Sequence, residues 1–567
     1  MKKEQKHLLI YCALLSLLFL AVCSQSSFLY PLNDWYDAND FLTMGKGILH
    51  GLVPYRDLYE QKGPILYFLH SICALVPGPH FFGVYLLEAG AFTVFLYYAA
   101  KLILLYLPPR AAYWILPALS GLLLSSESFC QGDSAEELCA ALLMVCLYDT
   151  MEYFTRSYPG PIPYRKLFTN GLLAGVIFWI KYTLLGLHLA FMAVLFFLYL
   201  KRKKYRRSAA SCLVFLAGMA LPAVPVLIYF AFHGALSDLM QVYFYNNIFL
   251  YDSQKSSGIF SLVLTIFLRI GDTFFRNLQF SLFTVIGVLA FLLTGRFLSC
   301  AAGKLMLLLE AGFLAFFIYT GSNFPYYGYI LCIFPVLGFI AIGALAEFLT
   351  GKCRQLPSPR EMAETIRRSL HHLLMRFLPP QFMGSFGNDP AYSSTDFRKE
   401  DGHASRRTWD ASAQAEASRF RPGYLLAILV FLLFAFYKSP NTYRIGTPRK
   451  ELVQYQFAEI IRETPDATLL NYGFLDAGFY TVCDILPTER FFQMQNISYE
   501  AFPEMMDSQN ECIREQRVDY LILRGEEVPE WILDYYCIVK EQRQLYEGAN
   551  VNYILLQKKP SGADTTR

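Results

Sequence analysis

Residues 37–68, a short stretch after the first apolar run, carry side chains that can do chemistry. Within 26 residues the stretch includes the ionisable groups Asp37, Asp40, Arg56, Asp57, Glu60 and Lys62. Carboxylates can accept a proton and cations can hold an anionic group. The stretch is therefore either an ordinary solvated loop or a site built at a membrane surface.

The composition indicates a membrane protein. Of the 567 residues, 55% are hydrophobic and only 17% are charged, whereas soluble domains are about 25% charged. The net charge of +3 and the lack of a basic run interleaved with aromatic residues argue against a nucleic-acid partner. The 13 cysteines show neither a disulfide framework nor the spacing of zinc ligands.

Apolar runs of about 20 residues, the length that crosses a bilayer, recur along the chain. The predicted spans are residues 8–30, 81–104, 111–127, 135–152, 208–232, 278–296, 303–320, 327–348 and 423–440. The apolar region 169–200 is too long for one span and carries Lys181 in its middle, so we interpret it as two short helices joined by an outward-facing turn. The sequence thus predicts a mainly α-helical, multi-pass protein of the cell membrane with about 11 transmembrane helices.

The basic residues predict which loops are cytoplasmic. With a cytoplasmic N-terminus, the run KRKKYRR at 201–207 also lies inside, as the positive-inside rule requires. The linker 351–422 is then cytoplasmic, and its composition predicts that it is largely disordered. The last span, 423–440, places the C-terminus outside.

Residues 441–567 have a different pattern. A helix-like stretch, ELVQYQFAEIIRE, precedes four β-rich runs: ATLLNYGF, VDYLILRG, YCIVKEQ and VNYILLQKK. This order predicts a small extracytoplasmic α/β domain.

The loop 31–80 after the first span is predicted to lie along the membrane. The apolar residues of FLTMGKGILHG recur at helical spacing, which indicates a surface helix. Asp37 and Asp40 flank the start of that helix, where a carboxylate can cap free N–H groups. A second apolar helix, ILYFLHSICALV, is too short to span comfortably.

The motifs of this loop resemble those of a known class of enzymes. Asp37 is followed four residues later by Phe41, then by Gly45, Gly51, VPYRD at 53–57, Glu60 and KGP at 62–64. The pattern resembles bacterial membrane glycosyltransferases of the GT-C class (glycosyltransferase family 39-like), related to protein O-mannosyltransferases and lipid A aminoarabinose transferases. Three further segments also resemble the family: GDSAEEL with Glu136 and Glu137, GLLAGVIFWIKYT with Lys181, and NFPYYGYILCIFP with Tyr326 and Tyr327.

The resemblance implies a GT-C fold over residues 1–350 and transfer of a sugar from a polyprenyl-phosphate donor to a cell-envelope acceptor on the outer face. It implies that Asp37 is the general base, with Glu60 as a second catalytic carboxylate. Lys62, Lys181 and Arg56 would hold the donor phosphate. Further possible site residues are Asp57, Glu136, Glu137, Tyr326 and Tyr327. No cofactor is implied, and a divalent metal is left open.

Each of these residues also has a structural interpretation. Asp37 could cap a helix, and Asp34 and Asp40 could be capping or solvated groups. Lys181 could extend to the membrane interface, and Glu136 and Glu137 could favour a helix start. Tyr326 and Tyr327 could belong to an interfacial aromatic belt. Two carboxylates inside predicted spans, Glu88 and Glu310, are more often paired structurally than functional.

Two other functions fit a polytopic chain of this kind. One is a transporter or flippase of lipid-linked sugars, which would place ionisable groups at the midplane and show two related halves. Here the charges gather in outer loops and no symmetry between halves is visible, which favours the enzyme. The other is a non-catalytic assembly protein on the same fold, because fold alone does not decide function.

Overall fold

A computed structural model describes residues 3–250, 258–321, 323–349, 422–546 and 549–560. The linker predicted at 351–422 lies outside these residues except for Pro422. The α-helices before the linker are α1 (Lys3–Cys23), α2 (Tyr36–Leu49), α3 (Pro64–Cys73), α4 (Phe82–Tyr106), α5 (Pro109–Leu124), α6 (Ala135–Glu152), α7 (Tyr164–Lys181), α8 (Gly186–Lys201), α9 (Tyr205–Ala220), α10 (Ala223–Phe232), α11 (Leu236–Leu239), α12 (Ile259–Arg276), α13 (Leu278–Leu293), α14 (Ala301–Tyr319) and α15 (Pro335–Leu349). After the linker follow α18 (Pro422–Lys438), α19 (Val453–Ile461), β1 (Leu469–Tyr472), α20 (Phe479–Cys483), α21 (Pro503–Arg514), β2 (Tyr520–Arg524), β3 (Tyr536–Tyr546) and β4 (Ala549–Lys558).

The predicted count of 11 spans is not confirmed. Among the described residues, six helical segments are long and apolar enough to cross a membrane: Lys3–Cys23, Phe82–Tyr106, Ala135–Ser157, Tyr164–Leu184, Tyr205–Phe232 and Ala301–Tyr319. Two bent pairs would bring the number to eight if each pair is one span: α12 meets α13 at 117°, and the 3₁₀ segment η5 (Pro325–Ile333) meets α15 at 44°. The remaining predicted spans form helices such as α8 and α18 that are shorter than about 20 residues.

The apolar region 169–200 folds as two helices, as predicted. Helix α7 ends at Lys181, a single 3₁₀ turn follows, and α8 begins at Gly186. The far end of α8 returns to the start of α7, since the Tyr199 hydroxyl accepts a hydrogen bond from the Ile162 amide at 3.1 Å. Lys181 therefore lies at the tip of a helical hairpin.

The C-terminal region forms the predicted α/β domain. Its four strands make one sheet in the order β1-β2-β4-β3, with β1 parallel to β2 and the other neighbours antiparallel. The buried residues of β2 pair with those of β4, for example Leu521 with Leu556. Three of the four strands have runs of buried residues, because their side chains join hydrophobic clusters with the packed helices of this domain.

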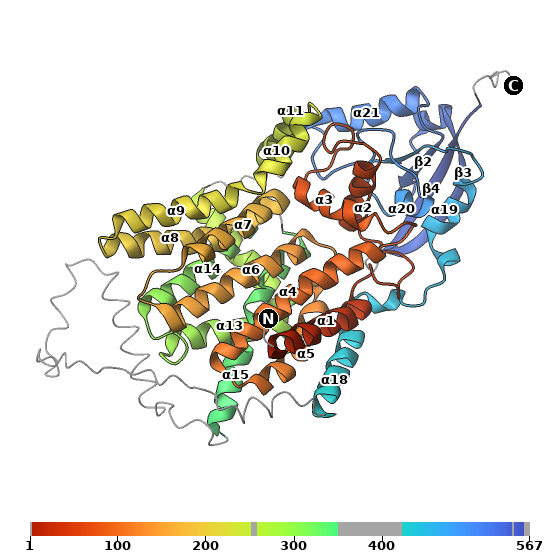
Figure 1. Ribbon diagram of the computed structural model, residues 1–567. Helices are drawn as coiled ribbons and strands as arrows, with labels where there is room; N and C mark the ends of the chain where they lie inside the picture. The colour runs from red at the N-terminus through yellow and green to blue at the C-terminus, as the bar shows by residue number, and fades with distance from the viewer. Residues whose placement is uncertain (1–2, 251–257, 322, 350–421, 547–548, 561–567) are drawn as a thin grey trace, which may run out of the picture.

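Helices α2 and α3 lie between the helical bundle and the C-terminal sheet (Figure 1). The two helices pack backbone against backbone, because a Cβ on Gly45 would lie only 2.5 Å from the carbonyl carbon of His70. On the other side the C-terminal domain docks on the loop: the Tyr455 hydroxyl donates to the Pro31 carbonyl at 2.7 Å, and Lys46 pairs with Asp484 at 3.1 Å. The charged loop is thus enclosed between two parts of the chain.

Candidate active site

Asp37 and Lys62 form the first half of the candidate site. Asp37 lies in the first turn of α2, and its Oδ2 is 3.3 Å from Nζ of Lys62. Lys62 comes just before α3, which Pro64 starts at its first position. Both side chains are partly accessible, 16% for Asp37 and 19% for Lys62, so a bound molecule could reach either one.

The capping interpretation of Asp37 is wrong. The residue at the N-cap of α2 is Trp35, and no side chain caps this helix. The carboxylate of Asp37 instead faces the lysine, although its place in the first turn also suits the positive end of the helix dipole.

Glu60 is buried and holds the backbone of Lys62. Its Oε2 accepts the amide N–H of Lys62 at 2.7 Å and also accepts a hydrogen bond from the Tyr67 hydroxyl. Its Oε1 is 3.8 Å from the Lys62 ammonium. Since Glu60 is only 1% exposed, its contacts are those of a group that orients Lys62.

Lys181, Glu136, Tyr326 and Tyr327 form the second half. Lys181 Nζ lies 2.5 Å from Glu136 Oε1 and 3.8 Å from the centre of the Tyr327 ring. The Tyr326 ring is 5.3 Å away. Lys181 is 11% and Glu136 1% exposed, so the lysine is paired inside the protein and does not extend to the membrane interface.

The two halves belong to one site. The amide of Gly63, next to Lys62, donates to the carbonyl of Ile180, next to Lys181, at 2.9 Å. This approach requires glycine, because a Cβ at position 63 would lie 2.1 Å from the carbonyl oxygen of Trp179. Tyr327 lies within electrostatic range of Glu136, Lys62 and Asp37.

Glu137 points to a different cluster from its neighbour Glu136. Its Oε2 accepts the Asp133 amide at 2.9 Å, and Glu88 accepts the same amide at 2.9 Å. Glu88 also accepts from the Ser24 hydroxyl, and Glu310 accepts from Thr150 at 2.7 Å. The carboxylates of the predicted spans are thus hydrogen-bonded within the protein.

His70 and Asp133 are a pair that the sequence reading missed. The imidazole Nε2 lies 3.0 Å from both oxygens of the Asp133 carboxylate, and both residues are fully buried. Asp133 is in turn within electrostatic range of Asp37. The motif GDSAEEL already contained Asp133, which directly precedes Ser134, the N-cap residue of α6.

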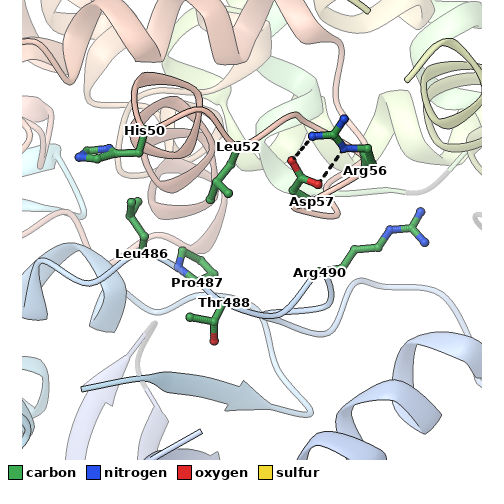
Figure 2. Close-up of a pocket in the computed structure, with 8 residues that line it drawn as sticks. All are labelled: His50, Leu52, Arg56, Asp57, Leu486, Pro487, Thr488 and Arg490. Atoms are coloured by element: carbon green, nitrogen blue, oxygen red, sulfur yellow. Dashed lines mark hydrogen bonds and ion pairs between the residues drawn. The ribbon is translucent and has the colours of Figure 1, made fainter. Parts of the chain in front are cut away.

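Arg56 and Asp57 lie elsewhere, at the wall of an open pocket of about 560 Å³ between the first loop and residues 486–490 (Figure 2). Arg56 binds Asp57 through two hydrogen bonds of 2.8 Å and donates to the His233 carbonyl. The guanidinium holds the pKa of the Asp57 carboxyl below its usual value. With these donors engaged, Arg56 has less to offer a phosphate than the resemblance implied.

Asp34 and Asp40 are neither solvated nor capping groups. Asp34 is buried and pairs with Arg444 of the C-terminal region at 2.9 Å. Asp40 is 1% exposed, and burial together with the neighbouring carboxylates of Asp476 and Glu60 raises its pKa well above the usual value. Both interpretations failed because the covering residues lie more than 400 positions later in the chain.

The sequence and structure were compared with known proteins. No family model and no curated protein matches the sequence. The fold is similar to ArnT from Cupriavidus metallidurans bound to undecaprenyl phosphate, with a TM-score of 0.54, 12% identity and 98% of each chain covered. The apo state of ArnT gives a TM-score of 0.53 at 14% identity, with 97% of each chain covered. The oligosaccharyltransferase AglB from Archaeoglobus fulgidus aligns at a TM-score of 0.45 and 14% identity, over 100% of this chain and 75% of that one.

The chain has the GT-C fold. At 12–14% identity the likeness to ArnT concerns the fold alone. On this GT-C fold the site combines two lysines, two tyrosines and three carboxylates at the junction of the first loop with α6 and α7. No group of three or more His, Cys, Asp or Glu residues in the described part of the chain could hold a metal ion.

Proposed function

We propose that this GT-C protein is an integral membrane glycosyltransferase that moves a sugar from a polyprenyl-phosphate donor to a cell-envelope acceptor on the extracytoplasmic face. The observation that carries the proposal is that two lysines, Lys62 and Lys181, lie in one site near Tyr327. Each ammonium is paired with a carboxylate. The backbone segments that carry the two lysines are joined by the Gly63–Ile180 hydrogen bond. Two fixed cations next to a reachable carboxylate suit the transfer of a group from a phosphate.

The proposed reaction needs one proton acceptor and one stabilised leaving group. The acceptor hydroxyl loses its proton to the Asp37 carboxylate as its oxygen bonds to the anomeric carbon of the sugar. The bond between that carbon and the phosphate oxygen breaks, and its electron pair stays with the phosphate. Lys62 and Lys181 offset the charge that develops there.

The contacts of Lys62 couple donor binding to the base. Before the donor binds, the ammonium of Lys62 neutralises Asp37 at 3.3 Å. A donor phosphate would compete for this ammonium, which would leave Asp37 free to accept a proton. Glu60 would keep the Lys62 backbone fixed during the exchange, because it binds the amide and not only the ammonium.

The donor class is supported by the fold neighbour ArnT, which was crystallised with undecaprenyl phosphate. The transporter alternative receives less support, because two carboxylates inside candidate spans, Glu88 and Glu310, have internal hydrogen-bond donors. The paired lysines lie in loop segments and at a helix end, where a headgroup could reach them.

The proposal is tested by the lipids of cells that lack the protein. Such cells should accumulate one polyprenyl-phosphate sugar, and the wild-type protein or Asp40→Asn should clear it. Asp37→Asn, expressed at the same level, should not clear it. Normal lipid profiles in the deletion strain, or clearance by Asp37→Asn, would contradict the proposal.

A further inference from the structure

Arg490 of the C-terminal domain reaches the loop that carries Lys62. Its Nε donates a hydrogen bond to the carbonyl of Tyr55 at 3.0 Å, and its own carbonyl accepts the amide of Tyr59 at 2.9 Å. The guanidinium lies over the rings of Tyr59 and Phe491, with 5.8 and 5.1 Å to their centres. In Figure 2 Arg490 comes from the C-terminal segment that faces Arg56 and Asp57 across the pocket.

Tyr55 has an unusual backbone. Its φ is +71°, in the left-handed region that a bulky residue rarely adopts. The residue is fully buried, and its ring stacks on Phe230 with 5.5 Å between ring centres. A strained residue persists only where its surroundings fix it, and such residues cluster at functional sites.

Tyr55 is also connected directly to Lys62. Its hydroxyl donates to the Lys62 carbonyl at 2.6 Å, and the Tyr67 hydroxyl, which donates to Glu60, lies 2.9 Å from the same oxygen. Glu60 holds the Lys62 amide from the other side. A chain of named contacts therefore runs from Arg490 through Tyr55 to the backbone of Lys62.

We propose that Arg490 is a positioning residue, which fixes the strained Tyr55 backbone and thereby places Lys62. The C-terminal domain then has a part in the reaction without supplying a group that touches the substrate. The role of the C-terminal domain in the reaction rests on the proposed function, whereas the effect of Arg490 on the conformation of the loop does not. The charge of Arg490 also pairs with Glu504 at 3.5 Å, but the contact with Tyr55 is made by the Nε–H donor and does not require that charge.

The test compares two substitutions at this position. In Arg490→Gln the amide nitrogen stands the same number of bonds from Cβ as the arginine Nε, so the donor is kept while the charge is lost. In Arg490→Ala both are lost. Arg543→Ala is the matched control, since Arg543 is an exposed arginine of the same domain that pairs with Glu526.

The first readout is hydrogen–deuterium exchange of the full-length protein in lipid nanodiscs without ligand. Arg490→Ala should speed exchange in residues 54–62 about tenfold, as expected for the loss of one part-buried hydrogen bond. Arg490→Gln and Arg543→Ala should exchange like the wild type. Equal exchange in Arg490→Ala and wild type, or equally fast exchange in Arg490→Ala and Arg490→Gln, would overturn the proposal. So would faster exchange throughout the C-terminal domain, because that would mean general undocking.

The second readout is the affinity for undecaprenyl phosphate in the same nanodiscs. Arg490→Ala should weaken binding about tenfold through the displaced Lys62, and Arg490→Gln should restore it to within about twofold. Unchanged binding by Arg490→Ala would contradict the positioning role. If the wild type itself bound no polyprenyl phosphate, the proposed function would fail, while the exchange experiment would still decide what Arg490 does to the loop.

Discussion

At the scale of single residues, the adjacent pair Glu136 and Glu137 shows how one sequence motif divides between two tasks. Successive residues of an α-helix point about 100° apart. Glu136 therefore meets Lys181 at 2.5 Å, whereas Glu137 turns to the Asp133 amide beside Glu88. Of the two, only Glu136 contacts a proposed phosphate ligand.

Lys62 should contribute most of the electrostatic attraction for the donor phosphate on its side of the site. Replacing Lys62 by alanine removes a charge-assisted contact and should weaken binding of undecaprenyl phosphate roughly 10- to 100-fold. The control is Lys46→Ala, since Lys46 pairs with the exposed Asp484 on the outer side of α2. Binding measured in nanodiscs should be near normal for the control, and equal affinity of Lys62→Ala and wild type would remove Lys62 from the donor site.

At the scale of elements, the close approach of the loop to the end of α7 joins the two halves of the site. Gly63→Ala would push a methyl group against the Trp179 carbonyl, with only 2.1 Å between them. The backbones must separate, so the protein should lose roughly 1–3 kcal/mol of stability. Gly90→Ala in α4 is the control, because no atom lies within 4 Å of its added Cβ and alanine favours a helix.

Thermal unfolding in lipid measures both glycine variants. The melting temperature of Gly63→Ala should fall while that of Gly90→Ala stays level or rises. A Gly63→Ala protein with the wild-type melting temperature would show that the contact between the loop and α7 is loose.

The sequence was sufficient to predict most individual elements. The apolar periodicity located α2 and α3, the charge at Lys181 located the break between α7 and α8, and the β-rich runs located all four strands. The sequence analysis placed a span at 278–296 but none over α12, so it did not predict the 117° bend between α12 and α13. Within the site, motif residues such as Asp37 and Lys62 were predictable, whereas Arg490 and Asp476 were not, because no local pattern shows which distant segment will cover the loop.

At the scale of the whole molecule, the C-terminal domain closes over the first loop through a buried acidic contact. Asp476 accepts a hydrogen bond from Thr43 of α2 at 3.2 Å, and Asp40 of the same helix is within its electrostatic range. Burial raises the pKa of Asp476 from 3.8 to about 6. The docking of the two parts should therefore depend on pH.

The sign of this dependence follows from the raised pKa. The folded protein holds the Asp476 proton more tightly than the unfolded chain, so this group contributes stability below about pH 4 that is lost as pH rises to about 6. A difference of about two pKa units corresponds to about 3 kcal/mol. Asp476→Asn should abolish this component, so the stability difference between variant and wild type should change between pH 4 and 7. A constant difference across that range, measured by denaturant unfolding in lipid, would contradict the assignment.

The orientation of the chain is a separate prediction at this scale. Reporter fusions should show a cytoplasmic N-terminus and an extracytoplasmic C-terminus, because the basic run 201–207 favours the inside. In intact cells a protease site placed at 201–207 should be protected, and cleavage there would reverse the proposed topology.

The central claim is that Asp37 is the base, and single-turnover sugar transfer by purified protein in lipid tests it most directly. Asp37→Asn keeps the size of the side chain but cannot take the acceptor proton, so the rate should fall roughly 10²–10⁴-fold while donor binding survives. Asp40→Asn is the matched control on the same helix, because the raised pKa of Asp40 means that a neutral amide replaces a carboxyl that already favours its neutral form. The account predicts a large loss for Asp37→Asn and a mild effect for Asp40→Asn. Near-normal transfer by Asp37→Asn would contradict it and remove Asp37 from the mechanism.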